Sequence, residues 1–213
     1  MRFRLTYDGE LRPTQRDPIQ DQSNPLAKHK HKIRKVFHAQ LKQLWATDKF
    51  LREAKIARVR SEGEFEQVHP HSNVLPMAEV LAEQYKEFGY RFVPLVREEW
   101  YLLCSIRILF LRRDIPGSVF SAGDIDNRIK TIIDGLRRPR NANELVGYES
   151  PENGEDPFYV LLEDDSQVTH LEVETDNLLD PPINGGADQR RARLVITVEL
   201  RPYYVTMLNM SFS

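Results

Sequence analysis

The chain has 213 residues, of which 40% are hydrophobic and 29% charged, which is typical of one soluble globular domain. Its 30 basic and 32 acidic residues nearly balance. No apolar run reaches the ~18 residues of a transmembrane helix, and the first residues lack the apolar centre of a secretory signal, so a cytoplasmic location is expected. The single cysteine, Cys104, excludes an internal disulfide and a multi-thiolate zinc or iron–sulfur site. A bound metal therefore needs carboxylate or histidine ligands.

The N-terminal part of the chain is predicted to hold one strand and two helices. Apolar and polar residues alternate from Phe3 to Leu11, which predicts a half-buried strand. Apolar residues at spacings of three and four then predict an amphipathic helix of about five turns from Pro25. The same spacing predicts a second helix from Met77 to about Gly89. The region from about 25 to 91 is therefore expected to be helical.

The second half combines strands with one more helix. Trp100 to Leu111 is apolar at nearly every position, which predicts a central strand. A helix is predicted to begin near Asp124, because isoleucines and a leucine form one continuous stripe along the next twelve residues. Residues 137–157 have no clear period and predict a long loop. Three further strands are predicted at Phe158–Leu162, Val168–Thr175 and Ala192–Leu200. These elements predict a single α+β domain in which helices pack on a mixed sheet.

Charge is unevenly distributed along the chain. Residues 25–60 contain eleven Lys or Arg against two acidic residues, whereas residues 141–189 contain thirteen Asp or Glu and no Lys or Arg. A basic face binds phosphates and an acidic centre binds divalent cations, although a solvated helix followed by an acidic loop has the same composition. The segment from Lys28 to Lys32, with His29 and His31, is expected to be a solvated or phosphate-facing helix turn. The candidate phosphate contacts are Lys28, Lys30, Lys32, Arg34, Lys35, Lys42, Arg112, Arg113 and Arg128.

Candidate chemistry centres on acidic residues at two places. Asp124 and Asp126 lie at the start of a helix whose opposite face is isoleucine, so their carboxylates leave the core together. Lys130 follows Asp126 by one helical turn and reaches over the same side. The pair Asp164–Asp165 lies between two predicted strands. Mg²⁺ takes one or two protein carboxylates with phosphate and water oxygens, so these groups suit phosphodiester cleavage. A helix N-cap at Asp124 and a polar turn at Asp164–Asp165 are the structural alternatives.

The order of these residues resembles that of the RusA-type Holliday junction resolvases. The shared pattern is Asp124-Ile125-Asp126-Asn127, then Lys130, then Asp134-Gly135-Leu136, then Asp164-Asp165-Ser166-Gln167-Val168 at the start of a strand. The resemblance covers Trp100 to about Leu200. It implies a homodimeric α+β nuclease that uses Mg²⁺, or Mn²⁺ in its place, to nick opposed strands of a four-way DNA junction.

The resemblance also implies roles for single residues. Asp124, Asp126 and Asp165 become the catalytic acids and metal ligands, Asp164 a further ligand, and Lys130 the catalytic lysine. Asn127, Asp134, Gln167 and His170 become supporting residues, although an ordinary core or edge histidine is the simpler interpretation of His170. This chain differs from compact members of the family by its region 25–91 and by the loop 137–157. A non-catalytic nucleic-acid-binding protein and a metal-dependent RNA nuclease remain the alternatives.

Overall fold

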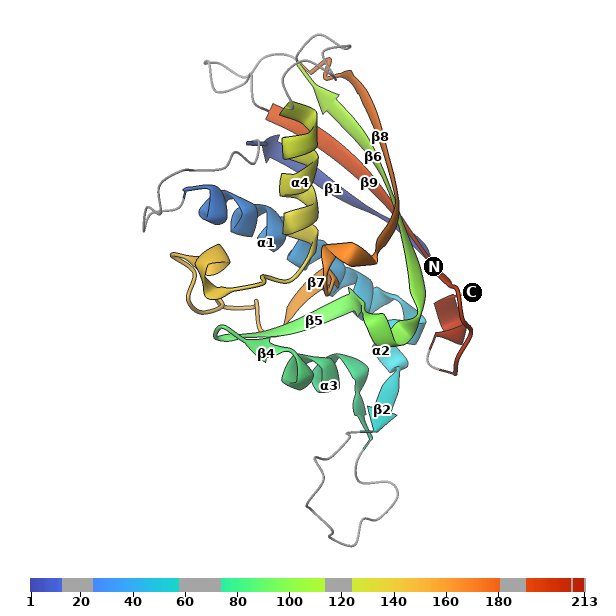
Figure 1. Ribbon diagram of the computed structural model, residues 1–213. Coiled ribbons are helices and arrows are strands. Elements are labelled where there is room, and N and C mark those ends of the chain that lie inside the picture. The colour runs from blue at the N-terminus through green and yellow to red at the C-terminus, as the bar shows by residue number, and fades with distance from the viewer. Residues whose placement is uncertain (13–24, 58–73, 114–123, 181–190, 208, 213) are drawn as a thin grey trace, which may run out of the picture.

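The computed structural model describes residues 1–12, 25–57, 74–113, 124–180, 191–207 and 209–212 of the chain. Within these ranges it is an α+β protein with mixed sheets and four α-helices (Figure 1). The helices are α1 (Pro25–Thr47), α2 (Lys49–Glu53), α3 (Met77–Gln84) and α4 (Asp124–Leu136). The strands are β1 (Arg2–Glu10), β2 (Lys55–Ala57), β3 (Val74–Pro76), β4 (Lys86–Glu87), β5 (Tyr90–Val96), β6 (Leu102–Arg112), β7 (Phe158–Leu162), β8 (Val168–Asn177) and β9 (Arg191–Pro202).

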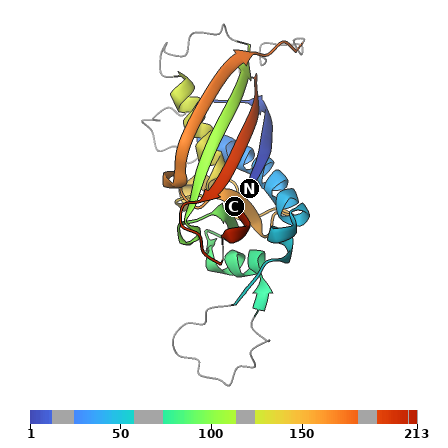
Figure 2. The ribbon, with the colours of Figure 1, turned by 90° about the vertical axis from the view of Figure 1, so that its right-hand side faces the viewer.

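The larger sheet has the strand order β1-β9-β6-β8. β9 pairs antiparallel with both β1 and β6, whereas β8 runs parallel to β6. Burial alternates strictly along β6 and β9, because one face of the sheet packs on α1 and α4 while the other faces solvent. Figure 2 shows the solvent-facing side, on which no described helix lies. The central position predicted for the strand after Trp100 is confirmed.

A smaller sheet of order β4-β5-β7 lies below the first and holds most of the differences from the sequence prediction. The expectation of helix throughout residues 25–91 was wrong. Strands β2 and β3 precede α3, which ends at Gln84, and β4 and the start of β5 follow it. β5 is buried along nearly its whole length, so its sequence shows no alternation that marks a strand. Pro94 is accommodated because β5 pairs with β4 only at its first residues and is an edge strand beyond them.

Helix α1 packs against both sheets and carries two buried histidines. His38 accepts a hydrogen bond from the backbone N–H of Tyr159 at 2.8 Å, and its ring stacks on Phe158. His31 is fully buried against aromatic rings, and burial lowers its pKa to about 3, so it is neutral. The expectation of a solvated or phosphate-facing turn was therefore wrong for His31. None of the described helices is both long enough and apolar enough to cross a membrane.

Candidate active site

The N-terminal half of α4 exposes two of the predicted catalytic residues. Ile125 and Ile129 are buried against the sheet, whereas Asp126 and Lys130 are exposed on the opposite side of the helix. Because the two residues are four apart, they lie one above the other on the helix surface. The side chain of Asp124 lies outside the described part of the structure, although its backbone begins α4 as predicted.

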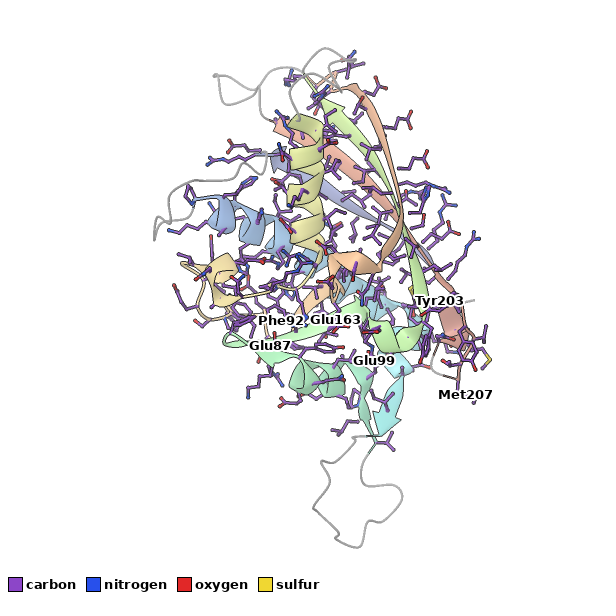
Figure 3. The ribbon with its side chains drawn as sticks, viewed as in Figure 1. Glu87, Phe92, Glu99, Glu163, Tyr203 and Met207 are labelled. Carbon is purple, nitrogen blue, oxygen red and sulfur yellow. The ribbon has the colours of Figure 1, made fainter. Side chains whose placement is uncertain are left out.

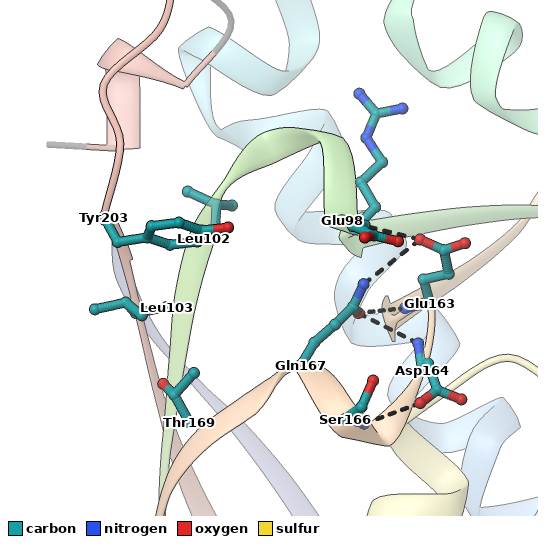
Figure 4. A pocket seen from close by; sticks show the side chains of 10 residues that line it. Glu98, Leu102, Leu103, Glu163, Asp164, Ser166, Gln167, Thr169 and Tyr203 are labelled. Atoms are coloured by element: carbon teal, nitrogen blue, oxygen red, sulfur yellow. Dashed lines mark hydrogen bonds between the residues drawn. The ribbon is translucent and has the colours of Figure 1, made fainter.

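The pair Asp164–Asp165 lies in a rigid turn between β7 and β8. The Asp164 carboxylate accepts the backbone N–H of Ser166 at 3.0 Å, and Gln167 Oε1 accepts the backbone N–H groups of Glu163 and Asp164 at 3.1 and 3.2 Å (Figure 4). This reciprocal capping box fixes the turn and makes Gln167 a structural support. The Ser166 N–H and the Arg140 guanidinium hold the pKa of Asp164 well below its usual range, so its carboxylate is ionised.

Arg140 joins the two carboxylates of this turn. Its Nε and Nη2 donate to Asp164 Oδ2 at 3.1 and 2.9 Å, and the same Nη2 also donates to Asp165 Oδ1. Two carboxylates from neighbouring residues thus converge on one cationic nitrogen. Arg140 belongs to the loop after α4 and was not among the predicted site residues.

Arg137 and Arg138 complete the positive side of this cluster. Arg138 lies 2.6 Å from Glu87 and 3.8 Å from Glu163, two acids labelled in Figure 3. Arg137 lies 3.9 Å from Asp165 Oδ2. The sequence Arg-Arg-Pro-Arg immediately after α4 was a visible signal for this role, because three arginines face a turn of three acids. The arginines of residues 137–140 therefore largely neutralise the acidic residues 163–165.

Asp134 lies at the same end of α4, inside a buried ion network. It accepts hydrogen bonds from Lys30 Nζ at 2.6 Å and from Arg137 Nη2 at 2.8 Å. Burial on its own raises the pKa of Asp134, but the hydrogen bonds and charges of Lys30 and Arg137 outweigh it and lower the pKa. Arg34, fully buried, donates to the Asp134 carbonyl at 2.9 Å and pairs with Glu144 at 3.3 Å. Asp134 thus stabilises the junction of α1, α4 and the following loop.

The described part of the chain does not bring all the predicted acids together. Asp165 contacts Arg137 and Arg140, which follow the C-terminal end of α4. Asp126 lies eleven residues before Arg137, a rise of ~16 Å along a helix. In Figure 1 the turn before β8 lies beside the lower end of α4, and the N-terminal end of α4 is at the top. The set Asp126, Lys130 and Asp165 is therefore divided between the two ends of one helix.

Most of the predicted phosphate contacts are buried or have partners within the chain. Lys35 pairs with Glu152 and Glu155 at 2.7 and 2.8 Å, and Lys42 donates to the Gly154 carbonyl at 2.6 Å. Lys30 and Arg34 belong to the Asp134 network. Through these four basic residues, α1 holds the loop 137–157 in place. Arg112 and Arg128 are buried rather than exposed, and Arg113 is half-buried.

Four predicted contacts or supports remain near the surface. Lys32 is exposed and makes no ion pair within the described ranges of the chain, and Lys28 is half-buried beside Gly147. His170 is exposed on β8, 3.8 Å from Glu172, so it belongs to neither the core nor the acidic turn. Asn127 is half-buried on α4.

Two hollows flank the acidic turn. One, of about 380 Å³, is lined by Glu163, Asp164 and Gln167 on one side and by Leu103 and Tyr203 on the other (Figure 4). The second, of about 490 Å³, is lined by residues 87–88, 138–140 and 163–164. Both are open and include charged residues in their linings, so the turn is accessible from two sides.

The ligand chemistry of the turn fits a hard divalent cation. The carboxylates of Asp164 and Asp165 converge on the cationic Arg140 nitrogen, so both are oriented toward one positive charge. Two carboxylates plus water and phosphate oxygens match the usual ligands of Mg²⁺. No group of three or more His, Cys, Asp or Glu side chains that could hold a metal occurs among the described residues, which leave out the side chain of Asp124.

Comparison with family models, with curated proteins and with solved structures finds no match to this chain.

Proposed function

We propose that this protein is a Mg²⁺-dependent, structure-selective endonuclease that hydrolyses phosphodiester bonds in branched DNA, as the RusA-type resolvases do. The observation that carries the proposal is the ordered pattern from Asp124 to Val168 together with its local setting. Asp126 and Lys130 share the exposed face of a helix, and Asp164-Asp165 form a capped turn that leads directly into a strand. The pattern requires this setting for its residues to act on a phosphate.

The residues of the pattern have different roles in the proposed cleavage. When bound, Mg²⁺ neutralises the scissile phosphate and lowers the pKa of a coordinated water. Asp124, Asp126 and Asp165, with Asp164, are the ligands that would hold the ion. The Lys130 ammonium is placed to stabilise charge on the phosphate or on the leaving oxygen. Gln167 holds the turn that presents Asp164 and Asp165.

The division of the acids between the two ends of α4 favours a homodimer. β8 begins directly after the acidic turn and runs to the end of the sheet near the start of α4 (Figure 1). If two copies pair antiparallel through β8, the acidic turn of one protomer lies at the level of the partner's α4 N-terminus. A two-fold axis then completes two equivalent sites, one for each strand of a junction.

β8 has the features of a strand that pairs with a second copy. All ten of its residues are exposed or half-buried, and no described strand pairs with its outer edge. Leu171 and Val173 lie on the same face as the buried Ile106 and Ile108, yet Leu171 remains 44% exposed. At the opposite edge of the sheet, Gln40 accepts the N–H of Thr6 and donates to its carbonyl, both at 2.8 Å, which blocks β1. Long edges without a pairing strand favour strand addition.

The test of the function is incubation of the pure protein with labelled four-way, forked and linear DNA, with and without Mg²⁺. We expect Mg²⁺-dependent nicks near the branch point and little cleavage of linear duplex. Binding without cleavage under every metal condition would favour the non-catalytic alternative. Equal or faster cleavage of a structured RNA would favour the RNA nuclease.

The test of assembly is light scattering, where we expect a mass near twice 24.9 kDa. Val173→Pro removes a backbone donor from the edge and should yield monomers that do not cleave. Glu172→Gln is the matched control, because antiparallel pairing places acidic residues of the two β8 strands near each other and their loss should tighten the dimer. A wild-type monomer that cleaves both strands would contradict the shared site.

A further inference from the structure

Arg140 lies between the two carboxylates of the acidic turn, and it is the most exposed of the three arginines there. Its side chain is 52% exposed, and its guanidinium pairs with the carboxylates of Asp164 and Asp165. Arg137 has only 5% of its side chain exposed and is held by Asp134, Glu144 and the Arg138 carbonyl. Exposed ion pairs contribute little to stability, so Arg140 exchanges its partner at little cost.

We propose that Arg140 is a switch between metal binding and phosphate binding, an inference that rests on the proposed function. Without a divalent cation, its guanidinium neutralises the acidic turn. When a cation takes the carboxylates, the guanidinium is released beside the same turn and contacts a DNA phosphate at the hollow that Arg138, Pro139 and Arg140 line. Arg140 is thus a positioning residue that couples occupancy of the acidic turn to substrate binding.

Arg140 and a cation shared by the two carboxylates would exclude each other. One atom, Nη2, lies within hydrogen-bond distance of both carboxylates, so a metal ion shared by them cannot occupy the same place at the same time. Nearby arginines already neutralise Glu163 and Asp134, which leaves Arg140 free to move without exposing a buried charge. The released guanidinium stays on a loop that Lys35 and Lys42 anchor to α1, so it remains near the turn.

Calorimetric titration of the full-length protein with Mn²⁺ tests the switch. We compare the wild type with Arg140→Ala and with Arg91→Ala. Arg91 is the matched control, because this arginine also bridges carboxylates of separate segments, Glu79 and Asp156, away from the acidic turn. If Arg140 covers the carboxylates nine-tenths of the time, Arg140→Ala lowers the Kd for Mn²⁺ about tenfold, and Arg91→Ala leaves it unchanged.

A second measurement follows the released guanidinium. In an Asp126→Asn background, which prevents cleavage, Arg140→Ala should weaken four-way-junction binding several-fold in the presence of Mn²⁺ and leave it unchanged without Mn²⁺. Circular dichroism confirms that each variant is folded.

The outcomes separate the switch from the function. Equal Mn²⁺ affinity of wild type and Arg140→Ala overturns the switch, and if the wild type still cleaves junctions with Mg²⁺ the proposed function stands. A wild type that neither binds Mn²⁺ nor cleaves overturns both. Tighter Mn²⁺ binding with unchanged junction affinity overturns the phosphate contact.

Discussion

The two ends of α4 differ in how their charges are used. At the N-terminal end, Asp126 and Lys130 are exposed, and neither forms an ion pair within the described part of the chain. At the C-terminal end, Asp134 is buried between Lys30 and Arg137. Both ends carry an acid and a base three or four residues apart, about one helical turn, so sequence spacing does not distinguish them. Burial does, since a desolvated ion pair must be satisfied internally whereas an exposed one is available to a ligand.

Because of this difference, similar substitutions at the two ends of α4 should have different effects. Removing a charge from the exposed end should alter chemistry and leave the fold intact. Removing one from the buried end should alter the fold first. The predictions that follow test this separation, beginning with the largest expected effect.

The largest effect is expected for Asp126→Asn. The substitution keeps the size of the side chain and removes a proposed metal ligand, so junction cleavage should fall at least about a hundredfold, as for the loss of one strong transition-state contact. The midpoint of thermal unfolding should stay close to that of the wild type, because Asp126 is exposed. Cleavage near the wild-type rate by the pure variant would remove Asp126 from the mechanism.

At the opposite end of the helix, Asp134→Asn should cost about 3 kcal/mol of the free energy of unfolding, because Lys30 and Arg137 lose their buried partner. Urea unfolding measures this loss. Asp156→Asn, which weakens an exposed pair with Arg91, is the matched control and should cost about 0–1 kcal/mol. Similar losses for the two variants would show that the Asp134 network is not a stabilising one.

The stability contributed by Asp134 should depend on pH. Its folded-state pKa is lower than its unfolded-state value, so the contribution is complete above about pH 4 and is lost as the pH falls through the folded pKa. The difference in unfolding free energy between wild type and Asp134→Asn should therefore be constant from pH 7 to pH 5 and shrink toward pH 3. A difference that grows in acid would mean that the pKa of Asp134 is raised.

Sequence periodicity predicted the elements whose burial is one-sided. β1, β6, β9, α1 and α4 each alternate or repeat with the expected period, and their cores match the prediction. β5 was missed because it is buried on both faces, and β2 and β3 because three residues show no period. Periodicity therefore locates an element only where one face meets solvent.

The candidate site was less predictable, because charge along a sequence does not show which charges meet in space. Asp126 and Lys130 could be placed on one exposed face from helix phase alone. The pairing of Lys35 with Glu152 and of Arg140 with Asp164 joins segments more than twenty residues apart. The sequence predicted a separate basic surface and acidic centre. Because of these contacts, the basic and acidic residues form one largely neutral interface instead.

The smallest effect is expected at the surface of α1, where the predicted DNA-binding lysines now fall into two groups. Lys32 is exposed and Lys35 pairs with two glutamates. If DNA lies across this face, Lys32→Gln should reduce the slope of log binding constant against log salt by about 0.9, which corresponds to the counterion released by one phosphate contact. Lys35→Gln should leave the slope unchanged, because Glu152 and Glu155 already neutralise its charge.

Fluorescence anisotropy with a labelled four-way junction at several salt concentrations measures both slopes. Equal slopes for Lys32→Gln and wild type would place the DNA elsewhere, whereas a reduced slope for Lys35→Gln would mean that the acidic loop releases this lysine when DNA binds.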